Sequence, residues 1–301
     1  MSKVTIAALT AKDLEKVVEC DRLISGRSRR GFFEKRFGAQ ESASDGFIQI
    51  GAWTHGKLAG FASAHILEGE FGGGEIVAVL DALGVESDAR HQGIGLKLLE
   101  DIASLAKAHG ARRIISQAHW EQLGLVRLLA ASKFSISPQV VLERPLTSLE
   151  AREDDATIVV RSMNEADFNA VTAIDRKAMG LDRSAFYKRK FAEVLEQSGV
   201  RVSMVAEQDG IAVGFVMARV DYGEFGQTSP AAVLDTIGVR PGFDGHGVGA
   251  ALMAQLFQNL VSLRIERVRT VVPWNGYGLL SFLERNGFQP TEALSFAREL
   301  T

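Results

Sequence analysis

Residues 80–95 read LDALGVESDARHQGIG, and residues 234–249 read LDTIGVRPGFDGHGVG. Each stretch begins in an apolar run, which predicts a buried strand, and ends in a Gly-x-Gly that opens a long helical pattern. Glycines remove side chains where the helix begins, and the N–H groups of a first helical turn, helped by the helix dipole, bind anions such as a pyrophosphate. The sequence therefore predicts the same phosphate-binding loop twice in one chain.

The two loops belong to a repeat that runs through the chain at an offset of 154 residues. The offset holds without a slip, from Asp21 and Asp175 near the start of each copy to Leu146 and Leu300 near its end. A period of this length indicates a duplicated domain, because solenoid repeats are much shorter. We predict two domains, residues 1–150 and 151–301, with the charged stretch 148–155 as the linker between them.

Each copy predicts the same order of elements. A strand and a charged helical region come first, and a hairpin with an Asp-Gly or His-Gly turn follows. Next come a buried strand, the glycine loop, a long helix, another strand, a shorter helix and a final strand. In the first copy these last elements are expected near residues 76–85, 93–108, 113–118 and 124–132. The predicted fold class is α/β, with a mixed, mostly antiparallel sheet flanked by helices in each copy.

The composition is that of a soluble globular protein, with 46% apolar residues, 24% charged residues and a formal net charge of -3. Such a balance gives no electrostatic case for a nucleic-acid or membrane partner. The six histidines never occur at metal-ligand spacing, so we expect no metal. Cys20 is expected to be a small buried core residue. We see no signal peptide and no apolar span, and we expect a cytoplasmic protein.

The first loop, Arg-x-x-Gly-x-Gly after a buried strand in mid-domain, resembles the acetyl-CoA pyrophosphate loop of the GNAT acetyltransferase superfamily. The order of elements also matches, and the resemblance covers both copies almost end to end. It implies two tandem GNAT-type domains that use acetyl-CoA as co-substrate and transfer acetyl to a primary amine by direct attack in a ternary complex. The residues that the resemblance places at the cofactor are Leu83, Gly84, Val85, Arg90, His91, Gln92, Gly93, Ile94, Gly95, Ile237, Gly238, Val239, Asp244, Gly245, His246, Gly247, Val248, Gly249 and Asn275.

The sequence departs from the family pattern at several positions. Asp244 replaces the usual Arg or Gln of the loop, and Asn275, which resembles the family's pantetheine-binding Asn, lies about one residue too far from Phe288. Leu129 and Leu283 occupy the position of the Tyr that usually protonates the departing thiolate. The missing Tyr motivates an alternative function, a non-catalytic acyl-CoA-binding or regulatory protein. A Rossmann-type dinucleotide site is disfavoured, because its glycine motif should follow the first strand of a βαβ unit.

An amine must lose a proton before it attacks, which requires a base. We favour Asp81 and Asp235, since each interrupts an otherwise apolar strand, and burying a carboxylate without a purpose is costly. Glu224 lies in the loop that enters the second of these strands, and Tyr222 could replace the missing acid. The second copy, with Asn275 and nearby tyrosines, is the favoured catalytic half.

Other parts of the function stay open at this point. The acceptor is expected to be a small-molecule or a protein or peptide amine. A homodimer is one candidate assembly, and the two copies within one chain can pack together as a dimer would. Asp21 and Asp175, each followed by an arginine, are expected to form surface ion pairs.

Overall fold

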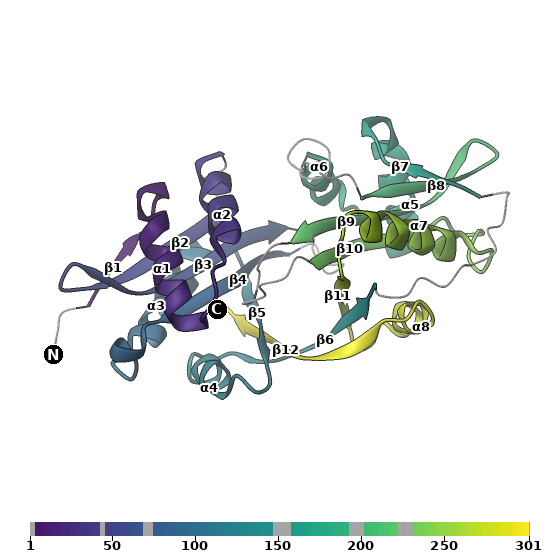
Figure 1. Cartoon of the computed structure of the whole chain (residues 1–301). Coiled ribbons are helices and arrows are strands. Elements are labelled where there is room, and N and C mark those ends of the chain that lie inside the picture. Colours follow the sequence, from purple (N-terminus) through teal and green to yellow (C-terminus); the bar gives the residue numbers. More distant parts are fainter. Residues whose placement is uncertain are drawn as a thin grey trace.

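The computed structural model describes residues 4–42, 46–68, 75–146, 158–192, 202–221, 225 and 231–300 (Figure 1). The first half contains β1 (Thr5–Ala8), η1 (Ala11–Asp13), α1 (Leu14–Ser25), α2 (Arg30–Ser42), β2 (Phe47–Thr54), β3 (Lys57–Glu68), β4 (Ile76–Val85), η4 (Ser87–Ala89), α3 (Ile94–Ala108), β5 (Arg113–His119), α4 (Leu123–Ala131) and β6 (Ser135–Pro145). The second half contains β7 (Val159–Ser162), η5 (Glu165–Asp167), α5 (Phe168–Met179), α6 (Ser184–Ala192), β8 (Met204–Gln208), β9 (Ile211–Asp221), β10 (Ala231–Val239), α7 (Val248–Ser262), β11 (Arg267–Pro273), α8 (Tyr277–Arg285) and β12 (Gln289–Glu299).

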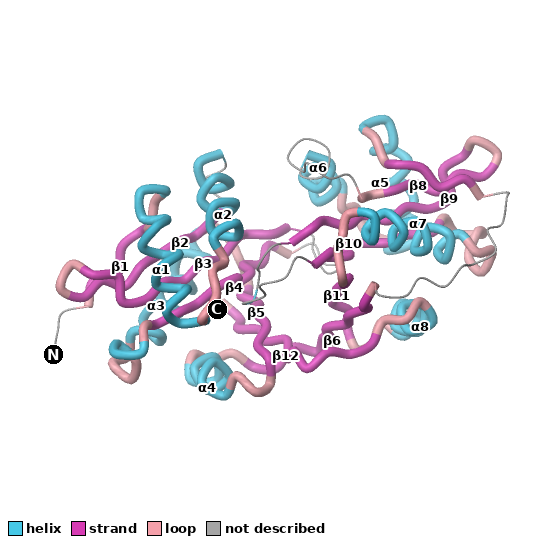
Figure 2. Tube along the Cα trace, viewed as in Figure 1, coloured by secondary structure: helices cyan, strands magenta, loops and turns pink. Residues whose placement is uncertain are grey.

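The predicted repeat appears in the structure residue by residue. Seven elements of the first half have the same bounds as their counterparts in the second half after a shift of 154 residues: β1, η1, α1, α3, β5, α4 and β6 match β7, η5, α5, α7, β11, α8 and β12. Figure 2 shows the resulting arrangement of strands with helices on both sides in each half. The prediction of two like α/β halves, each a mixed sheet flanked by helices, is confirmed. The predicted linker at residues 148–155 lies outside the described residues.

The two halves share one sheet of twelve strands, in the order β1-β2-β3-β4-β5-β12-β6-β11-β10-β9-β8-β7. The last strand of each copy pairs with the other copy. β12, which ends the chain, lies against β5 of the first half, and β6 lies against β11 of the second half (Figure 1). Each half therefore completes its sheet with a strand that the sequence repeat assigns to the other half.

The pairing of β6 with β12 follows a pseudo-twofold axis. Val140 pairs with Leu294, which is its own counterpart in the repeat, and the flanking pairs Leu142–Pro290 and Ile136–Phe296 are related by exchange of the two copies. Three residues bulge from each strand between these pairs, at 137–139 and at 291–293. The register is what a twofold dimer of single copies would form. The two copies therefore meet as an isologous pair, joined covalently.

Two arginines on the exchanged strands bind residues of the half with which each strand pairs. Arg298 on β12 donates to both carboxylate oxygens of Glu100 on α3, at 3.0 and 2.9 Å. Arg144 on β6 donates to the Asn286 carbonyl at 2.5 Å and lies over the Phe257 ring, 4.1 Å from its centroid. Bidentate and cation–π contacts of this kind specify a geometry as well as supplying energy. The exchange is thus held by side chains as well as by the strand ladder.

The sheet in the first half is covered on both faces. On one face α3 and α4 pack on a cluster that includes Ile114, Ala118 and Phe296. On the other face α1 and α2 pack on Phe61 and Ala82. The same cluster contains Cys20, which confirms the predicted core position. Burial raises the pKa of this thiol to about 12, so it is protonated at neutral pH and is no nucleophile.

The prediction that Asp21 and Asp175 form surface ion pairs with the adjacent arginines is wrong, because both the partners and the burial of the carboxylates differ. Both carboxylates are buried, and they bind Arg29 and Arg183 at the start of the next helix, with Nε–Oδ2 distances of 3.0 Å in each half. The neighbouring Arg22 pairs with Glu19 on the helix surface instead. A helix turns by about 100° per residue, so consecutive residues cannot share a face. The buried pairs tie the first helix of each half to its second.

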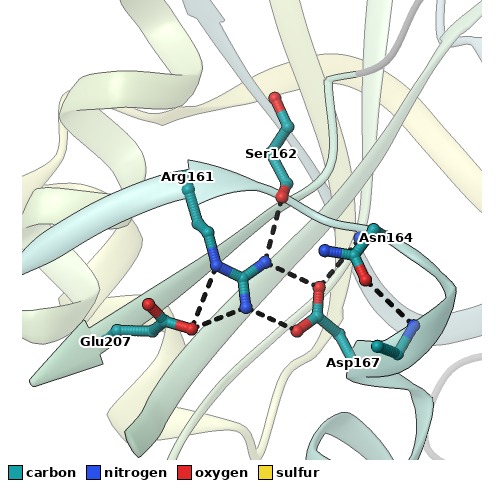
Figure 3. Close-up of polar contacts among 6 residues, drawn as sticks. Arg161, Ser162, Asn164, Asp167 and Glu207 are labelled. Carbon is teal, nitrogen blue, oxygen red and sulfur yellow. Dashed lines mark hydrogen bonds and ion pairs between the residues drawn. The ribbon is translucent and has the colours of Figure 1, made fainter. Parts of the chain in front are cut away.

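A polar network in the second half joins β7, η5 and β8 (Figure 3). Arg161 on β7 donates to Asp167 at 2.8 and 2.7 Å and to Glu207 on β8 at 3.0 and 2.6 Å, while Asp167 also accepts the Asn164 N–H at 2.8 Å. Burial by itself would raise the pKa of Asp167, but the hydrogen bonds from Arg161 and Asn164 outweigh it and lower that pKa. The position of Arg161 is Ala7 in the first half.

Candidate functional site

Asp81 and Asp235 occupy the same kind of backbone position in the two halves. Asp81 lies in β4 between Leu80, which pairs with Ala64, and Ala82, which pairs with Ser63, so it has no partner of its own across the strands. Asp235 lies in the matching interruption of the β10–β9 pairing. A residue in such a bulge leaves the regular alternation and its side chain is re-aimed. This is how a carboxylate comes to stand in an otherwise apolar strand.

In the first half, Asp81 is buried and its two oxygens have different surroundings. Oδ2 lies 2.8 Å from Nδ1 of His65 on β3 and 3.2 Å from Nε of Arg36 on α2. Oδ1 has no hydrogen-bond partner among the described residues. Since a carboxylate is an acceptor, His65 donates from Nδ1, and its Nε2 carries the lone pair in the neutral imidazole. The arrangement is a His–Asp pair with one buried carboxylate oxygen open to a further donor.

In the second half, the corresponding carboxylate lies between two cations. Asp235 Oδ2 is 3.3 Å from Nζ of Lys190, and Oδ1 is 3.4 Å from Nε of Arg219. Lys190 and Arg219 are the repeat counterparts of Arg36 and His65. Of these four basic side chains, only the imidazole has a ring nitrogen that can accept a proton, because charged lysine and arginine are donors only. The two halves thus share a carboxylate but differ in the group that could take a proton.

The central parallel strands part beside these carboxylates. Among the described residues, β4 pairs with β5 over Val77–Val79, and β10 pairs with β11 over two residues. Just beyond, a hydroxyl bridges the strands, from Ser116 Oγ to the Leu80 carbonyl at 3.1 Å and from Thr270 Oγ1 to the Leu234 carbonyl at 2.9 Å. Beyond this point, in the described part of the chain, the edge of β4 no longer pairs with β5, and the edge of β10 no longer pairs with β11. The predicted cofactor residues lie on these unpaired edges: Leu83, Gly84 and Val85 on β4, and residues 237–239 on β10.

The glycine loop lies at the end of the parted strand, and its two glycines have different roles. Gly93 is the N-cap of α3 with φ 78°, and Gly247 is the N-cap of α7 with φ 83°; neither helix has a side-chain cap. Among the described residues, no heavy atom lies within 4 Å of where a Cβ on Gly93 would stand, so the first turn of α3 is open. A Cβ on Gly95 or Gly249 would instead lie 2.8 Å from Leu128 or 3.0 Å from Phe282. The second glycine therefore permits the close packing of the shorter helix.

The other predicted loop residues divide by exposure. Ile94 and Val248 are buried in the two cores, so their side chains pack and do not face a ligand. Arg90 donates from Nε to the Val85 carbonyl at 3.1 Å, and Gln92 donates to the Asp88 carbonyl at 3.1 Å. The residues of the loop with exposed side chains are Arg90, His91, Gln92, Asp244 and His246, and the exposed glycines are Gly93, Gly245 and Gly247.

The remaining residues singled out in the sequence are exposed, buried or outside the described part of the chain. Asn275 is exposed in the turn before α8, whose N-cap is Gly276. Leu129 and Leu283 are fully buried in the cores, which explains why no acid stands at these positions. Tyr222 and Glu224 lie outside the described residues.

Sequence reasoning missed the partners of the two carboxylates. Two positions of the repeat carry these partners: Arg36 corresponds to Lys190, and His65 corresponds to Arg219. A basic residue at both positions in both copies was the sequence pattern that could have predicted the partners. In the described part of the chain, no group of three or more His, Cys, Asp or Glu side chains could hold a metal ion. None of the described helices has the length and apolar character needed to cross a membrane.

Comparison with known proteins gives a consistent result. A sequence model of the acetyltransferase (GNAT) family matches residues 14–130 and 169–288. A tandem GNAT protein from the clavulanic acid biosynthesis pathway has a similar structure, with 15% identity, a TM-score of 0.71 and 99% of each chain covered. A GCN5-related N-acetyltransferase from Sphaerobacter thermophilus is similar at 16% identity and a TM-score of 0.69, over 99% of this chain and 96% of the other.

A third similar structure is part of a larger protein. The glucosamine N-acetyltransferase region of a fungal multi-domain GH3 β-N-acetylglucosaminidase superposes with a TM-score of 0.71 at 13% identity. The match covers 99% of this chain and 38% of the fungal chain. At such identities the likeness concerns the fold.

Proposed function

Since this chain belongs to the acetyltransferase (GNAT) family, we propose that it transfers an acetyl group from acetyl-CoA to a primary amine. The observation that carries the proposal is the parting of β4 from β5 next to the open, glycine-capped first turn of α3. An extended thioester fits between parted strands, and its phosphates fit a helix N-terminus with no capping side chain. The same arrangement is repeated at β10, β11 and α7.

The residues present fit the phosphates of the co-substrate. The positive φ of Gly93 and Gly247 turns the chain into the helix, and the N–H groups that follow point away from it, where an anion would lie. Acetyl-CoA supplies the acetyl group as a thioester, whose carbon–sulfur bond breaks as the carbon–nitrogen bond forms and whose sulfur leaves with one proton as free CoA. The chain has to remove the other proton, which belongs to the ammonium form of the amine.

We assign that proton to the His65–Asp81 pair of the first half. Nε2 of His65 accepts the proton from the ammonium group. Asp81 Oδ2 accepts a hydrogen bond from Nδ1–H of His65 and so fixes the orientation of the ring, while the positive charge of Arg36 compensates the charge of the carboxylate. Asp235 instead lies 3.3 Å from Lys190 and 3.4 Å from Arg219, and a charged lysine or arginine has no lone pair that can accept a proton. These contacts favour the first half for chemistry, which is the reverse of the preference from the sequence.

The proposal is tested by melting temperature and by release of free CoA. Acetyl-CoA should raise the melting temperature, and Gly93→Glu together with Gly247→Glu should abolish the rise by filling the open first turns. Gly26→Glu is a matched control, because Gly26 also has positive φ, 71°, and open space around it, but it ends α1. A rise that survives the double substitution would show that acetyl-CoA binds elsewhere.

A non-catalytic acyl-CoA-binding protein is the second candidate, favoured by the burial of Leu129 and Leu283 where a thiolate acid would stand. Such a protein would show the same rise in melting temperature and would release no CoA with any amine. Turnover on a panel of amines therefore separates the two functions.

A further inference from the structure

A cavity of about 830 Å³ lies where the two halves meet, and both halves contribute to its wall. Its lining includes Gln117 and His119 at the end of β5, Glu292 on the bulge of β12, and Arg267 at the start of β11. Binding pockets for small molecules have this size. Because β12 and β6 are the exchanged strands, the cavity exists through the union of the two copies.

One end of the cavity reaches the parted strands of the first half. Ser116 bridges β5 to Leu80 of β4, so the next residues along the two strands, Gln117 and Asp81, lie at the same level. Asp81 faces α2 through Arg36, and Gln117 lies on the side of β5 opposite the residues that pack on α3. The wall of the cavity at Gln117 therefore belongs to the strand that flanks β4, the strand that carries Asp81.

The charges along the cavity are separated. At the end of β5, His119 accepts the Glu121 N–H at Nδ1, 3.3 Å, and donates from Nε2 to Glu292 at 2.8 Å. The carboxylates of Glu121 and Glu292 are 70% and 68% exposed, so this end is acidic and open. Across the cavity stands Arg267, whose side chain is 30% exposed and whose contact with Glu143 is long, 3.8 Å.

Among the described residues, the repeat does not reproduce these charges at the matching positions. The repeat counterparts of His119, Glu292 and Glu143 are Pro273, Pro138 and Ala297, none of which is charged. The counterpart of Arg267 is Arg113, which lies at the start of β5. The duplication has therefore produced an asymmetric dipolar cavity, and one of its walls, β5, belongs to the half that carries the His65–Asp81 pair.

We propose that this cavity binds the acceptor, and that the acceptor is a small amine that also carries a carboxylate or a phosphate. The inference rests on the proposed function. The ammonium group is attracted by Glu121 and Glu292 beside Gln117, and the anionic group binds the Arg267 guanidinium, which matches carboxylate and phosphate oxygens with paired donors. An amine without an anionic group makes no contact with Arg267, which keeps its long contact to Glu143, and such an amine therefore binds less tightly.

Matched pairs of amines test the inference. Glycylglycine is compared with glycylglycinamide, and O-phosphoethanolamine with ethanolamine, at saturating acetyl-CoA, with free CoA as the readout. The anionic member of at least one pair should have a kcat/KM at least tenfold higher, and the pair that responds identifies carboxylate or phosphate. Arg267→Gln should raise the KM of that member about tenfold or more with little change in kcat, and leave the neutral member unchanged. Glu143→Gln, which removes the competing carboxylate, should lower the same KM.

Arg113→Gln is the matched control and should change neither member. Equal loss for both members in Arg267→Gln, or preference for the neutral member in both pairs, would overturn the inference. If acetyl-CoA still raises the melting temperature but no member of either pair releases CoA, the acceptor class is wrong while the co-substrate site stands. If the melting temperature does not rise either, the proposed function itself fails.

Discussion

Phe296 and its repeat counterpart Leu142 test the strand exchange, because each should stabilise the half that does not contain it. Phe296 is 4% exposed and packs with Leu98 and Ile114 of the first half, whereas Leu142 is 4% exposed and packs with Val268 of the second half. Phe296→Ala loses about 2 kcal/mol of apolar transfer free energy. A remaining cavity of the order of 60 Å³ adds about 1.5 kcal/mol.

A loss of about 3–4 kcal/mol raises the population of locally open states by roughly two to three orders of magnitude. Hydrogen exchange read by mass spectrometry resolves where this happens. In Phe296→Ala the amides of α3 and β5 should lose protection by about that factor, and those of α7 and β11 much less. In Leu142→Ala, with an expected cost of about 2–5 kcal/mol, the pattern should be reversed. Loss of protection in α7 and β11 on changing Phe296 would mean that the last strand closes its own half, and would refute the exchange.

Three further outcomes follow from contacts already described. Asp81→Asn and His65→Gln should each cut turnover by roughly 10²–10⁴, and Asp235→Asn should cost much less; the opposite ranking would place the chemistry in the second half. Gly95→Ala should lower the unfolding free energy by about 1–3 kcal/mol through its clash with Leu128 at 2.8 Å, and adding Leu128→Ala should reverse part of that loss; if the pair is additive, the clash is absent. Arg161→Met should destabilise the protein by about 1–3 kcal/mol at pH 7 in denaturant unfolding. Because the folded-state pKa of Asp167 is lowered from 3.8, this difference is present above that value and fades as the pH falls through the folded pKa, and an equal difference at low pH would contradict the assignment.

The repeat was the strongest signal in the sequence, and it predicted the fold class and the matching of elements between the halves. Such a signal is local: alternation, glycine turns and helical spacing are properties of short segments, and each copy repeats them. Strand exchange leaves no such trace. β6 and β12 have the same pattern whether they pair within their own copy or with the other one, because the apolar side chains Leu142 and Phe296 meet an equivalent core in either case.

The candidate site was predicted in part for the same reason. An acidic residue inside an apolar strand is visible in the sequence, and Asp81 and Asp235 do lie in matching bulges. Their partners come from another strand and another helix, 16 and 45 residues away along the chain, and nothing local ties them to the carboxylates. The repeat offered indirect help, because the partner positions carry a cation in both copies.

The duplication has kept the scaffold and changed the residues that decide chemistry. Both halves retain the parted strands, the glycine-capped helix and the bulged aspartate. Within that common scaffold, His65 in the first half supplies an imidazole nitrogen that can accept a proton, and Arg219 at the same position of the second half supplies donors only. Glu292 at the position that is Pro138 in the other copy makes one side of the shared cavity acidic. Both differences point to the first half, and the second half then contributes Arg267 and a closing strand to a site that a single copy could not build.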